Sequence, residues 1–254
     1  MMQGIRRQVA ILDAVSNAHE SGISITELCA VTGLAKGTAH RLLEGLREHG
    51  IVVQEDLKRW RLGPRVAFWA GRYLEGPASL GSLRELTRRL SRETQFFTYL
   101  AILDGGEIVS VAVERPESKA HFFVQLGTRV PVLSTAAARA LLAFRPEEAA
   151  RPLVERAVEE NPRTRTETFT VESYLEELAE TRSRSYAECM EELEAGVSAL
   201  GAPVLNAQSV SVASLSVVAP TAALLEEWDE TVGTLRRIAE EGSMMLGREK
   251  VAGW

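Results

Sequence analysis

Apolar residues in the first fifty positions recur at the spacing of amphipathic helices. The pattern over residues 5–19 predicts one helix, which Gly22 ends. A second helix is predicted to start after Ser24, because Ser24 and Glu27 have the spacing of a capping box, and to stop at Gly33. A third helix follows, with four apolar positions on one face: Ala39, Leu42, Leu43 and Leu46. Two short helices joined by a glycine turn predict a helix-turn-helix.

A hairpin signal follows the third helix. Gly50 ends the helix, and residues 51–53 and 60–62 predict two short strands around the polar segment QEDLKR. Three helices and a hairpin make a winged helix-turn-helix, which we assign to residues 1–63. An ordinary solvated turn is the alternative for the charged tip of the hairpin.

The third helix has a polar side opposite its apolar stripe. At about 100° per residue, Gly37 and Arg41 point away from the core, with His40 beside them. The major groove of B-DNA admits such a helix, and its cations, hydroxyls and imidazole can reach phosphates and base edges. Adding the start of the first helix and the wing, we predict these DNA-binding residues: Arg6, Arg7, Lys36, Gly37, Thr38, His40, Arg41, Lys58, Arg59 and Arg61. A helical hairpin with a solvated outer face is the alternative.

Residues 64–76 predict a short aromatic helix. Pro64 suits a first helical turn, and Gly76 ends the segment. Helix-turn-helix proteins bind paired half-sites as two-fold dimers, so we expect the stripe on this linker helix to pack against a second copy. The predicted dimerisation residues are Val66, Trp69 and Tyr73. Packing of the stripe onto its own domain is the alternative.

The pattern over residues 77–254 alternates between helical and strand periods. Helices are predicted from Ser82 onward and at residues 134–144, 146–160, 171–184 and 221–247. Strands are predicted at residues 96–103, 107–114, 121–126, 197–205 and 209–219, and the first two form a hairpin around Asp104-Gly105-Gly106. The 134–144 helix is rich in alanine, which permits close backbone approach. The fold class is therefore α+β, with a winged helix-turn-helix, a linker helix and a C-terminal sheet flanked by helices.

Charge is distributed unevenly along the 254 residues, whose net charge is −6. Residues 1–75 contain ten Lys or Arg and eight Asp or Glu, about +2, which leaves about −8 for the rest. A DNA-binding protein can be acidic overall if its contact face is basic. Cys29 and Cys189 match no metal or redox spacing, and no apolar run reaches the roughly 18 residues of a membrane span. We expect a reduced, cytoplasmic protein that uses no cofactor, metal or membrane.

Four blocks, in the right order and spacing, are similar to the IclR family of bacterial transcriptional regulators. They are ITELCAVTGLAKGTAHRLLEGLREHGIV, WRLGPRV, LGTRVPVLSTAAARALLA and YAECMEELEAGVSALGAPV. The resemblance covers about residues 5–247 and implies a GAF-like antiparallel sheet in an effector-binding domain at 77–254, and assembly as dimers or dimers of dimers. Two departures stand out. Gly37 occupies a position where the family usually has Ser, and Ala138-Arg139 replaces the usual Gly-Lys.

The resemblance also implies an effector pocket. Family pockets for small keto acids carry polar groups at positions that align here with Cys189, Ala199, Ser216 and Val218, and the Ala-rich segment adds Ala136 and Ala137. Only Ser216 keeps a hydroxyl of the expected kind. A pocket with so few polar groups suits an apolar body, so we predict an aromatic or otherwise bulky effector. The alternative is that these residues line a core or a degenerate pocket.

The predicted function is a ligand-responsive regulator of a small-molecule catabolic operon, more specifically a repressor, that binds a palindromic operator in double-stranded DNA. A cysteine-dependent enzyme is one alternative, but glutamates surround Cys189 in sequence and His121 is the only histidine in the C-terminal part. No phosphate-binding loop or nucleophile elbow is visible, so we expect no enzyme. A helix-turn-helix used for protein contacts is the other alternative, and salt-dependent DNA binding would distinguish it.

Overall fold

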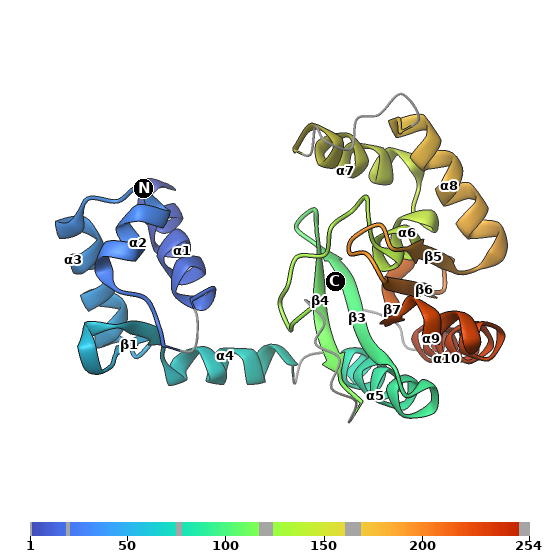
Figure 1. Ribbon diagram of the computed structural model, residues 1–254, viewed down its shortest axis with the longest axis horizontal. Coiled ribbons are helices and arrows are strands. Elements are labelled where there is room, and N and C mark those ends of the chain that lie inside the picture. The colour runs from blue at the N-terminus through green and yellow to red at the C-terminus, as the bar shows by residue number, and fades with distance from the viewer. Residues whose placement is uncertain (1, 19–20, 75–77, 117–123, 161–168, 249–254) are drawn as a thin grey trace. The chain divides into compact units, whose positions relative to one another are not determined.

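Two units, Met1–Gly76 and Pro77–Trp254, make up the computed structural model of the chain (Figure 1). The structure describes residues 2–18, 21–74, 78–116, 124–160 and 169–248. Each unit buries its own set of apolar side chains, so the chain has separate cores.

The N-terminal unit contains the predicted helix-turn-helix. Its helices are α1 (Met2–Ser16), α2 (Ile25–Thr32) and α3 (Lys36–Glu48). The backbone N–H of Ser24 donates to Glu27 Oε2 at 2.7 Å, and the N–H of Glu27 donates to Ser24 Oγ at 3.3 Å, which completes the capping box. Gly33 ends α2 with φ 68°, a left-handed conformation that suits glycine. The core side chains include Ile11, Leu28, Leu43 and Trp60.

The predicted hairpin follows α3. Strands β1 (Val52–Gln54) and β2 (Trp60–Leu62) pair antiparallel, and the turn between them includes the 3-10 helix η1 (Asp56–Lys58). Trp60 also exchanges two backbone hydrogen bonds with Ile23, at 2.9 and 2.8 Å. These bonds attach the base of the wing to the loop that precedes α2. Helix α4 (Pro64–Leu74) completes the unit.

The C-terminal unit is built on a five-stranded antiparallel sheet in the order β4-β3-β7-β6-β5. Its strands are β3 (Phe97–Asp104), β4 (Glu107–Glu114), β5 (Ala187–Met190), β6 (Val197–Leu205) and β7 (Ser211–Pro220). Figure 1 shows helices on both faces. One face is covered by α5 (Ala78–Thr94), α9 (Thr221–Glu226) and α10 (Trp228–Arg248). The other is covered by α6 (Ala136–Ala143), α7 (Glu147–Glu160) and α8 (Val171–Arg184).

Helix α6 lies very close to strand β6. A Cβ atom on Gly201 of β6 would be 2.5 Å from the carbonyl oxygen of Ala136 and 3.1 Å from the nitrogen of Ala137. Both alanines are fully buried. The small side chains of α6 and the missing side chain of Gly201 together allow this approach, as the Ala-rich pattern predicts.

Several predicted elements differ from the structure. Helix α5 starts at Ala78 rather than at Ser82, and its extra turn buries Leu80 in the core. The predicted helix at 221–247 is two helices, because the backbone leaves the helical conformation at Glu227 (φ −111°, ψ 23°). The N–H of Glu227 still bonds to α9, while its carbonyl accepts from Thr231 of α10.

Two differences concern strands. The part of the predicted 121–126 strand that is described, residues 124–126, forms loop and turn, and residues 121–123 lie outside the described residues. Strand β5 was not predicted, because it has four residues and no long alternating pattern. Within the described ranges, no helix combines the length and apolar character that crossing a membrane requires.

Candidate nucleic-acid interface and ligand cavity

Helix α3 presents a polar face to solvent. Ala39, Leu43 and Leu46 are buried against the other helices of the N-terminal unit. On the opposite side four of the predicted contact residues are exposed: Lys36, Gly37, His40 and Arg41. Thr38 is half-buried. The helix therefore divides its residues between core and surface as the periodicity predicts.

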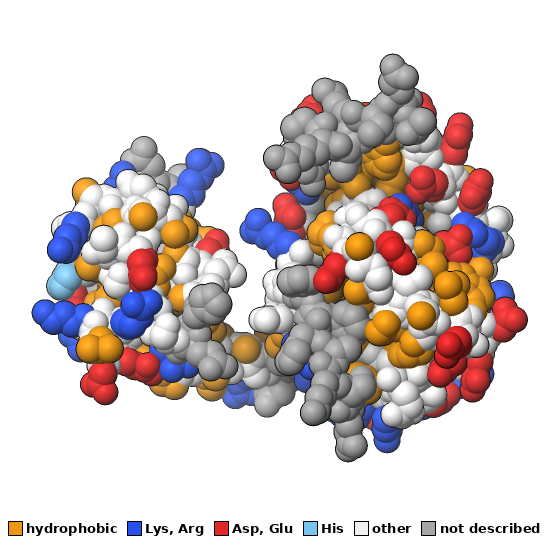
Figure 2. All heavy atoms as spheres, in the orientation of Figure 1, with side chains coloured by type: hydrophobic (Ala, Val, Ile, Leu, Met, Phe, Trp, Pro, Cys, Tyr) orange, Lys and Arg blue, Asp and Glu red, His pale blue; other side chains and the backbone are white. Residues whose placement is uncertain are grey.

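The basic and imidazole side chains of this face are without partners in the described part of the chain. Over the residues that the structure describes, Lys36, His40 and Arg41 make no side-chain hydrogen bond or ion pair. Arg47, one turn and a half further along the same helix, is instead bound to Glu44 at 2.6 Å. Positive charge that is not neutralised internally is available to an anionic partner. Figure 2 shows Lys and Arg side chains of this unit along one edge, with a histidine among them.

The residues predicted from the start of α1 and from the wing fall into two groups. Arg6 and Arg7 of α1 and Lys58 of the wing are exposed, with no ion pair to any described residue. Arg61 is exposed but pairs with Glu55 across the hairpin at 3.2 Å. Arg59 is the most engaged of these cations.

Arg59 binds the loop before α2 rather than pointing to solvent. Its guanidinium donates to the carbonyl oxygens of Ser21 at 2.9 Å and Gly22 at 2.8 Å, and it pairs with Glu27 at 3.1 Å. Glu27 is the capping-box residue of α2, so Arg59 connects the wing to the start of the helix-turn-helix. Arg59 therefore has an internal role, and its guanidinium is less available to DNA than the predicted wing position implies.

Helix α4 carries exposed aromatic side chains. Trp69 and Tyr73, predicted for dimerisation, are 44% and 52% exposed, and Val66 is half-buried. Phe68, at 62%, is more exposed than either and was not predicted, because it lies off the stripe that the helical spacing defined. The guanidinium of Arg65 lies 5.6 Å from the Trp69 ring centre. The helix thus offers a large apolar surface within its unit.

A cavity of about 50 Å³ lies in the C-terminal unit where the resemblance predicts the effector pocket. Of the six predicted effector residues, Cys189, Ala199 and Val218 line it. Ser216 does not: it is paired with Tyr99 in the register of strands β7 and β3, and its hydroxyl lies 3.4 Å from that of Ser214. Ala136 and Ala137 do not line it either, because both are packed under Gly201. The remaining lining residues are Tyr99, Val124, Ser134, Thr135, Leu193, Glu194, Val197 and Ser198.

Most polar atoms around this cavity are already bonded within the protein. The Cys189 thiol donates to the carbonyl of Ser134 at 3.2 Å, and Thr135 Oγ1 donates to the carbonyl of Pro131 at 2.7 Å. Ser198 and Thr221 share a hydrogen bond of 2.9 Å between their hydroxyls. The cavity is therefore predominantly apolar in what it offers a ligand.

Cys189 is not set up as a nucleophile. Burial, with the negative charge of Glu192 nearby, raises the pKa of its thiol to about 11, so the thiolate is scarce at neutral pH. No His, Cys, Asp or Glu cluster suited to a metal ion occurs in the described parts of the chain.

Arg139 forms a buried polar node beside the cavity. It is 5% exposed and pairs with Glu177 at 3.1 Å and Glu192 at 2.5 Å. It also donates to the carbonyls of Glu188 at 3.0 Å and Leu133 at 3.3 Å, and its guanidinium lies 5.6 Å from the Tyr174 ring centre. The node connects α6 and α8 to the turn at residues 191–196, which joins β5 to β6.

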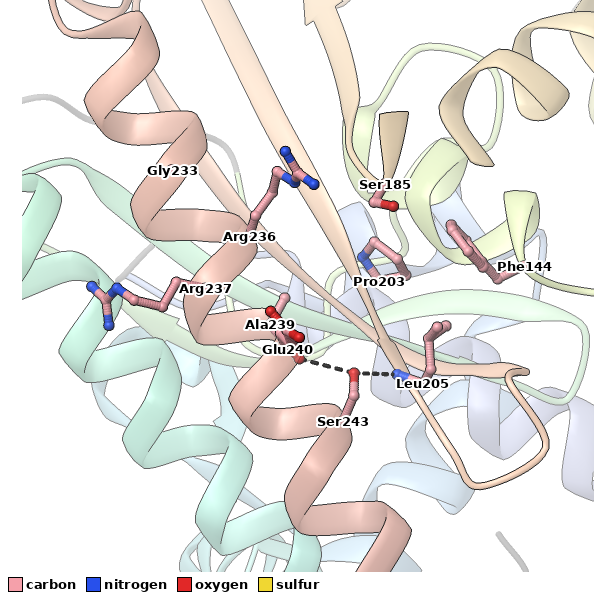
Figure 3. Close-up of a pocket in the computed structure, with 10 residues that line it drawn as sticks. All are labelled: Phe144, Ser185, Pro203, Leu205, Gly233, Arg236, Arg237, Ala239, Glu240 and Ser243. Carbon is pink, nitrogen blue, oxygen red and sulfur yellow. Dashed lines mark hydrogen bonds between the residues drawn. The ribbon is translucent and has the colours of Figure 1, made fainter. Parts of the chain in front are cut away.

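A larger hollow of about 510 Å³ lies beside β6, lined by residues of α10 and by Phe144 and Ser185 at the C-terminal ends of α6 and α8 (Figure 3). Arg236 projects into it, whereas Arg237 points to the opposite side, where it pairs with Glu93. Ser243 accepts the backbone N–H of Leu205 at 2.8 Å. None of the predicted effector residues lines this hollow.

Comparison with known proteins identifies the family. The family of the bacterial transcriptional regulator IclR C-terminal domain matches residues 80–244, and the IclR helix-turn-helix domain matches residues 4–56. The chain belongs to the IclR family. This IclR-family protein is 30% identical to the HTH-type transcriptional regulator XynR of Escherichia coli, over 98% of this chain and 97% of the relative.

Solved IclR structures share the fold. An IclR transcriptional regulator from Alicyclobacillus acidocaldarius matches with a TM-score of 0.81 and 23% identity, over 96% of this chain and 99% of that one. An IclR homologue from Microbacterium hydrocarbonoxydans, in complex with 4-hydroxybenzoate, matches with a TM-score of 0.76 and 23% identity over the same shares. The IclR-family chain is thus a DNA-binding transcriptional regulator, and the matched families are regulators rather than enzymes.

Proposed function

We propose that this chain is a repressor that binds a palindromic operator through α3 and releases it in response to an aromatic or bulky apolar effector. The proposal keeps a DNA-binding domain at 1–63, a linker at 64–76 and an effector domain at 77–254. The observation that carries it is the outer face of α3, where Lys36, His40 and Arg41 have no partner among the described residues while Arg47 on the same helix is paired. Such a regulator acts in the cytoplasm, where the bacterial chromosome lies.

Arg41 is proposed to reach a base edge or phosphate in the major groove, with His40, Lys36, Thr38 and the backbone at Gly37 beside it. Arg6, Arg7, Lys58 and Arg61 are proposed to contact phosphates, which position a protein on DNA without reading sequence. For Arg61 this requires release from Glu55, an exposed pair whose loss costs little.

The test compares two arginines of one helix. An operator is first selected from random duplexes, and binding is then measured by fluorescence anisotropy at several salt concentrations. Arg41→Ala should weaken specific binding by about 1–3 kcal/mol, roughly 5- to 150-fold in Kd. Arg47→Ala, the matched control, should change Kd by less than about threefold, because Arg47 is occupied by Glu44. Equal effects of the two variants, or binding that does not weaken with salt, would contradict the proposal.

Dimerisation is proposed through the stripe of α4 made by Val66, Trp69 and Tyr73, giving a dimer or a dimer of dimers. The support is the exposure of Trp69 and Tyr73, since large aromatic side chains favour buried positions at interfaces. A two-fold dimer would present two α3 helices to paired half-sites, which matches a palindromic operator.

The effector is proposed to enter the cavity lined by Cys189, Ala199 and Val218. Its volume of about 50 Å³ is too small for an aromatic ring, because a cavity that binds benzene has about 150 Å³. The 191–196 turn would have to move outward to enlarge the cavity. Its residues are exposed, and two of them, Leu193 and Glu194, line the cavity. The support for an aromatic ligand is the apolar lining, together with a relative of the same fold that binds 4-hydroxybenzoate.

The effector would act by shifting a population. Ligand binding would favour one arrangement of the linker helices in the dimer and so change the distance between the two α3 helices. A ligand can move that equilibrium only by its differential affinity for the two arrangements. The turn that must move is bound to Arg139 through Glu192, so the buried node is a route from the cavity to α6 and α8.

A further inference from the structure

The residues that line the cavity bear on the charge of the effector as well as on its size. Glu194 is the one charged residue among the described residues that line the cavity, and it is also exposed to solvent. Its carboxylate makes no hydrogen bond or ion pair with any described residue. No Lys, Arg or His occurs among the lining residues that the structure describes.

The nearby cation cannot serve a ligand. Arg139 has five N–H donors, and all five are used. Nε binds Glu177, Nη1 binds the carbonyl of Glu188 and the Glu192 carboxylate, and Nη2 binds the carbonyl of Leu133 and the same carboxylate. A ligand carboxylate would have to displace one of these bonds, and it would approach a turn that already carries Glu192 and Glu194.

Hydrogen-bonding capacity in the cavity points the same way. The Ser134 hydroxyl has no partner in the described structure, so it can donate or accept. The thiol of Cys189 and the hydroxyls of Thr135 and Ser198 are occupied. The Glu194 carboxylate is the one charged acceptor among the described lining groups, and a ligand that brings N–H or O–H donors can bond to it.

We propose that the effector is neutral or cationic at its polar end, an amide, amine or alcohol on an aromatic body, and that Glu194 selects against carboxylates. This inference rests on the proposed function, because it specifies the ligand of the same cavity. Placing a ligand carboxylate beside the Glu194 carboxylate brings like charges together with no cation among the described lining residues, which is unfavourable for both groups. The IclR homologue that binds 4-hydroxybenzoate shows that the fold can accept an acid, so the discrimination proposed here belongs to the side chains of this chain.

Three probes of one shape and different charge test the inference on the full-length protein. Isothermal titration calorimetry would measure the Kd of 4-hydroxybenzamide, 4-hydroxybenzylamine and 4-hydroxybenzoate. All three probes require the same opening of the cavity, so the free-energy cost of opening cancels when their Kd values are compared as ratios. For the unmodified protein we expect the amide and the amine to bind at least tenfold more tightly than the benzoate.

Glu194→Gln should reverse the dependence on charge. It removes a charge and keeps the shape, so benzoate affinity should rise at least tenfold, amine affinity should fall at least fivefold, and amide affinity should change by less than threefold. Glu191→Gln is the matched control, because Glu191 is exposed on the same turn but does not line the cavity. It should leave all three Kd values within about twofold, because the charge of Glu191 lies outside the cavity lining and is screened by solvent.

Two results would overturn the inference. One is benzoate binding as tight as amide binding in the unmodified protein, or unchanged by Glu194→Gln. The other is the absence of binding by the amide and the amine. Operator binding measured on the same samples separates the two proposals: if the ligand pattern fails but salt-dependent operator binding persists, the charge selection is wrong and the regulator function stands.

Discussion

Gly201→Ala tests the closest packing in the effector-binding unit. The added Cβ would lie 2.5 Å from the carbonyl oxygen of Ala136 and 2.7 Å from its carbonyl carbon. Ordinary contacts begin at 3.4 Å, so β6 and α6 must separate by about 0.9 Å. The atoms it meets belong to the backbone of a buried helix and cannot rotate away. Overpacking costs about 1–3 kcal/mol, and we expect the upper end of this range.

The assay is thermal unfolding of the full-length protein by calorimetry. A loss of about 3 kcal/mol in a unit of this size lowers its Tm by roughly 6–12 °C. The transition of the N-terminal unit should stay in place and serves as an internal reference. The Ala136 end of α6 is also displaced, so binding of 4-hydroxybenzamide should weaken together with the Tm.

Gly233→Ala is the matched control for the glycine substitution. Gly233 lies inside α10, and a Cβ there would meet no atom within 4 Å. Alanine in a helix interior is favoured over glycine by roughly 0.8–1 kcal/mol, so this variant should be slightly more stable. A Tm shift of less than about 2 °C for Gly201→Ala, or equal shifts for the two variants, would show that the sheet and α6 are not in contact as described.

Two further predictions concern ionic groups. Arg139→Met should destabilise the C-terminal unit by about 2–3 kcal/mol, since it leaves carbonyls and two half-exposed carboxylates without their shared partner; an unchanged Tm would exclude the node from the fold's stability. The pKa of Glu27 is lowered, chiefly by the hydrogen bond from the backbone N–H of Ser24. The ionised carboxylate therefore stabilises the N-terminal unit at neutral pH, and this stabilisation is lost as the pH falls below 4.5. Urea unfolding of the N-terminal unit between pH 6 and pH 3 should show this loss, and Glu27→Gln should be less sensitive to pH; identical pH profiles would contradict it.

Signals that act within a few residues could be read from the sequence. The capping box of Ser24 and Glu27, the left-handed Gly33 and the 97–114 hairpin are local, and the structure has all three. The α+β class followed from them. The alternating patterns of β6 and β7 likewise indicated strands, because both are long enough to show a period.

Features that depend on distant partners could not be read. Arg59 looks like an exposed wing cation in sequence, but the carbonyl of Gly22, 37 positions earlier, binds it. Ser216 was expected in the pocket, and only the register of β3 and β7 shows that it faces Tyr99. Glu194 was missed because nothing in the sequence places the 191–196 turn against the cavity.

The outer face of α3 has a consequence for how this regulator can diverge. Because Lys36, His40 and Arg41 hold no other described residue in place, the scaffold of the N-terminal unit does not depend on their identity. Single substitutions at these positions can therefore change which operator is bound, and the protein does not first need compensating substitutions in its core. Duplicated copies of such a gene could come to recognise new promoters while retaining the same folding energetics.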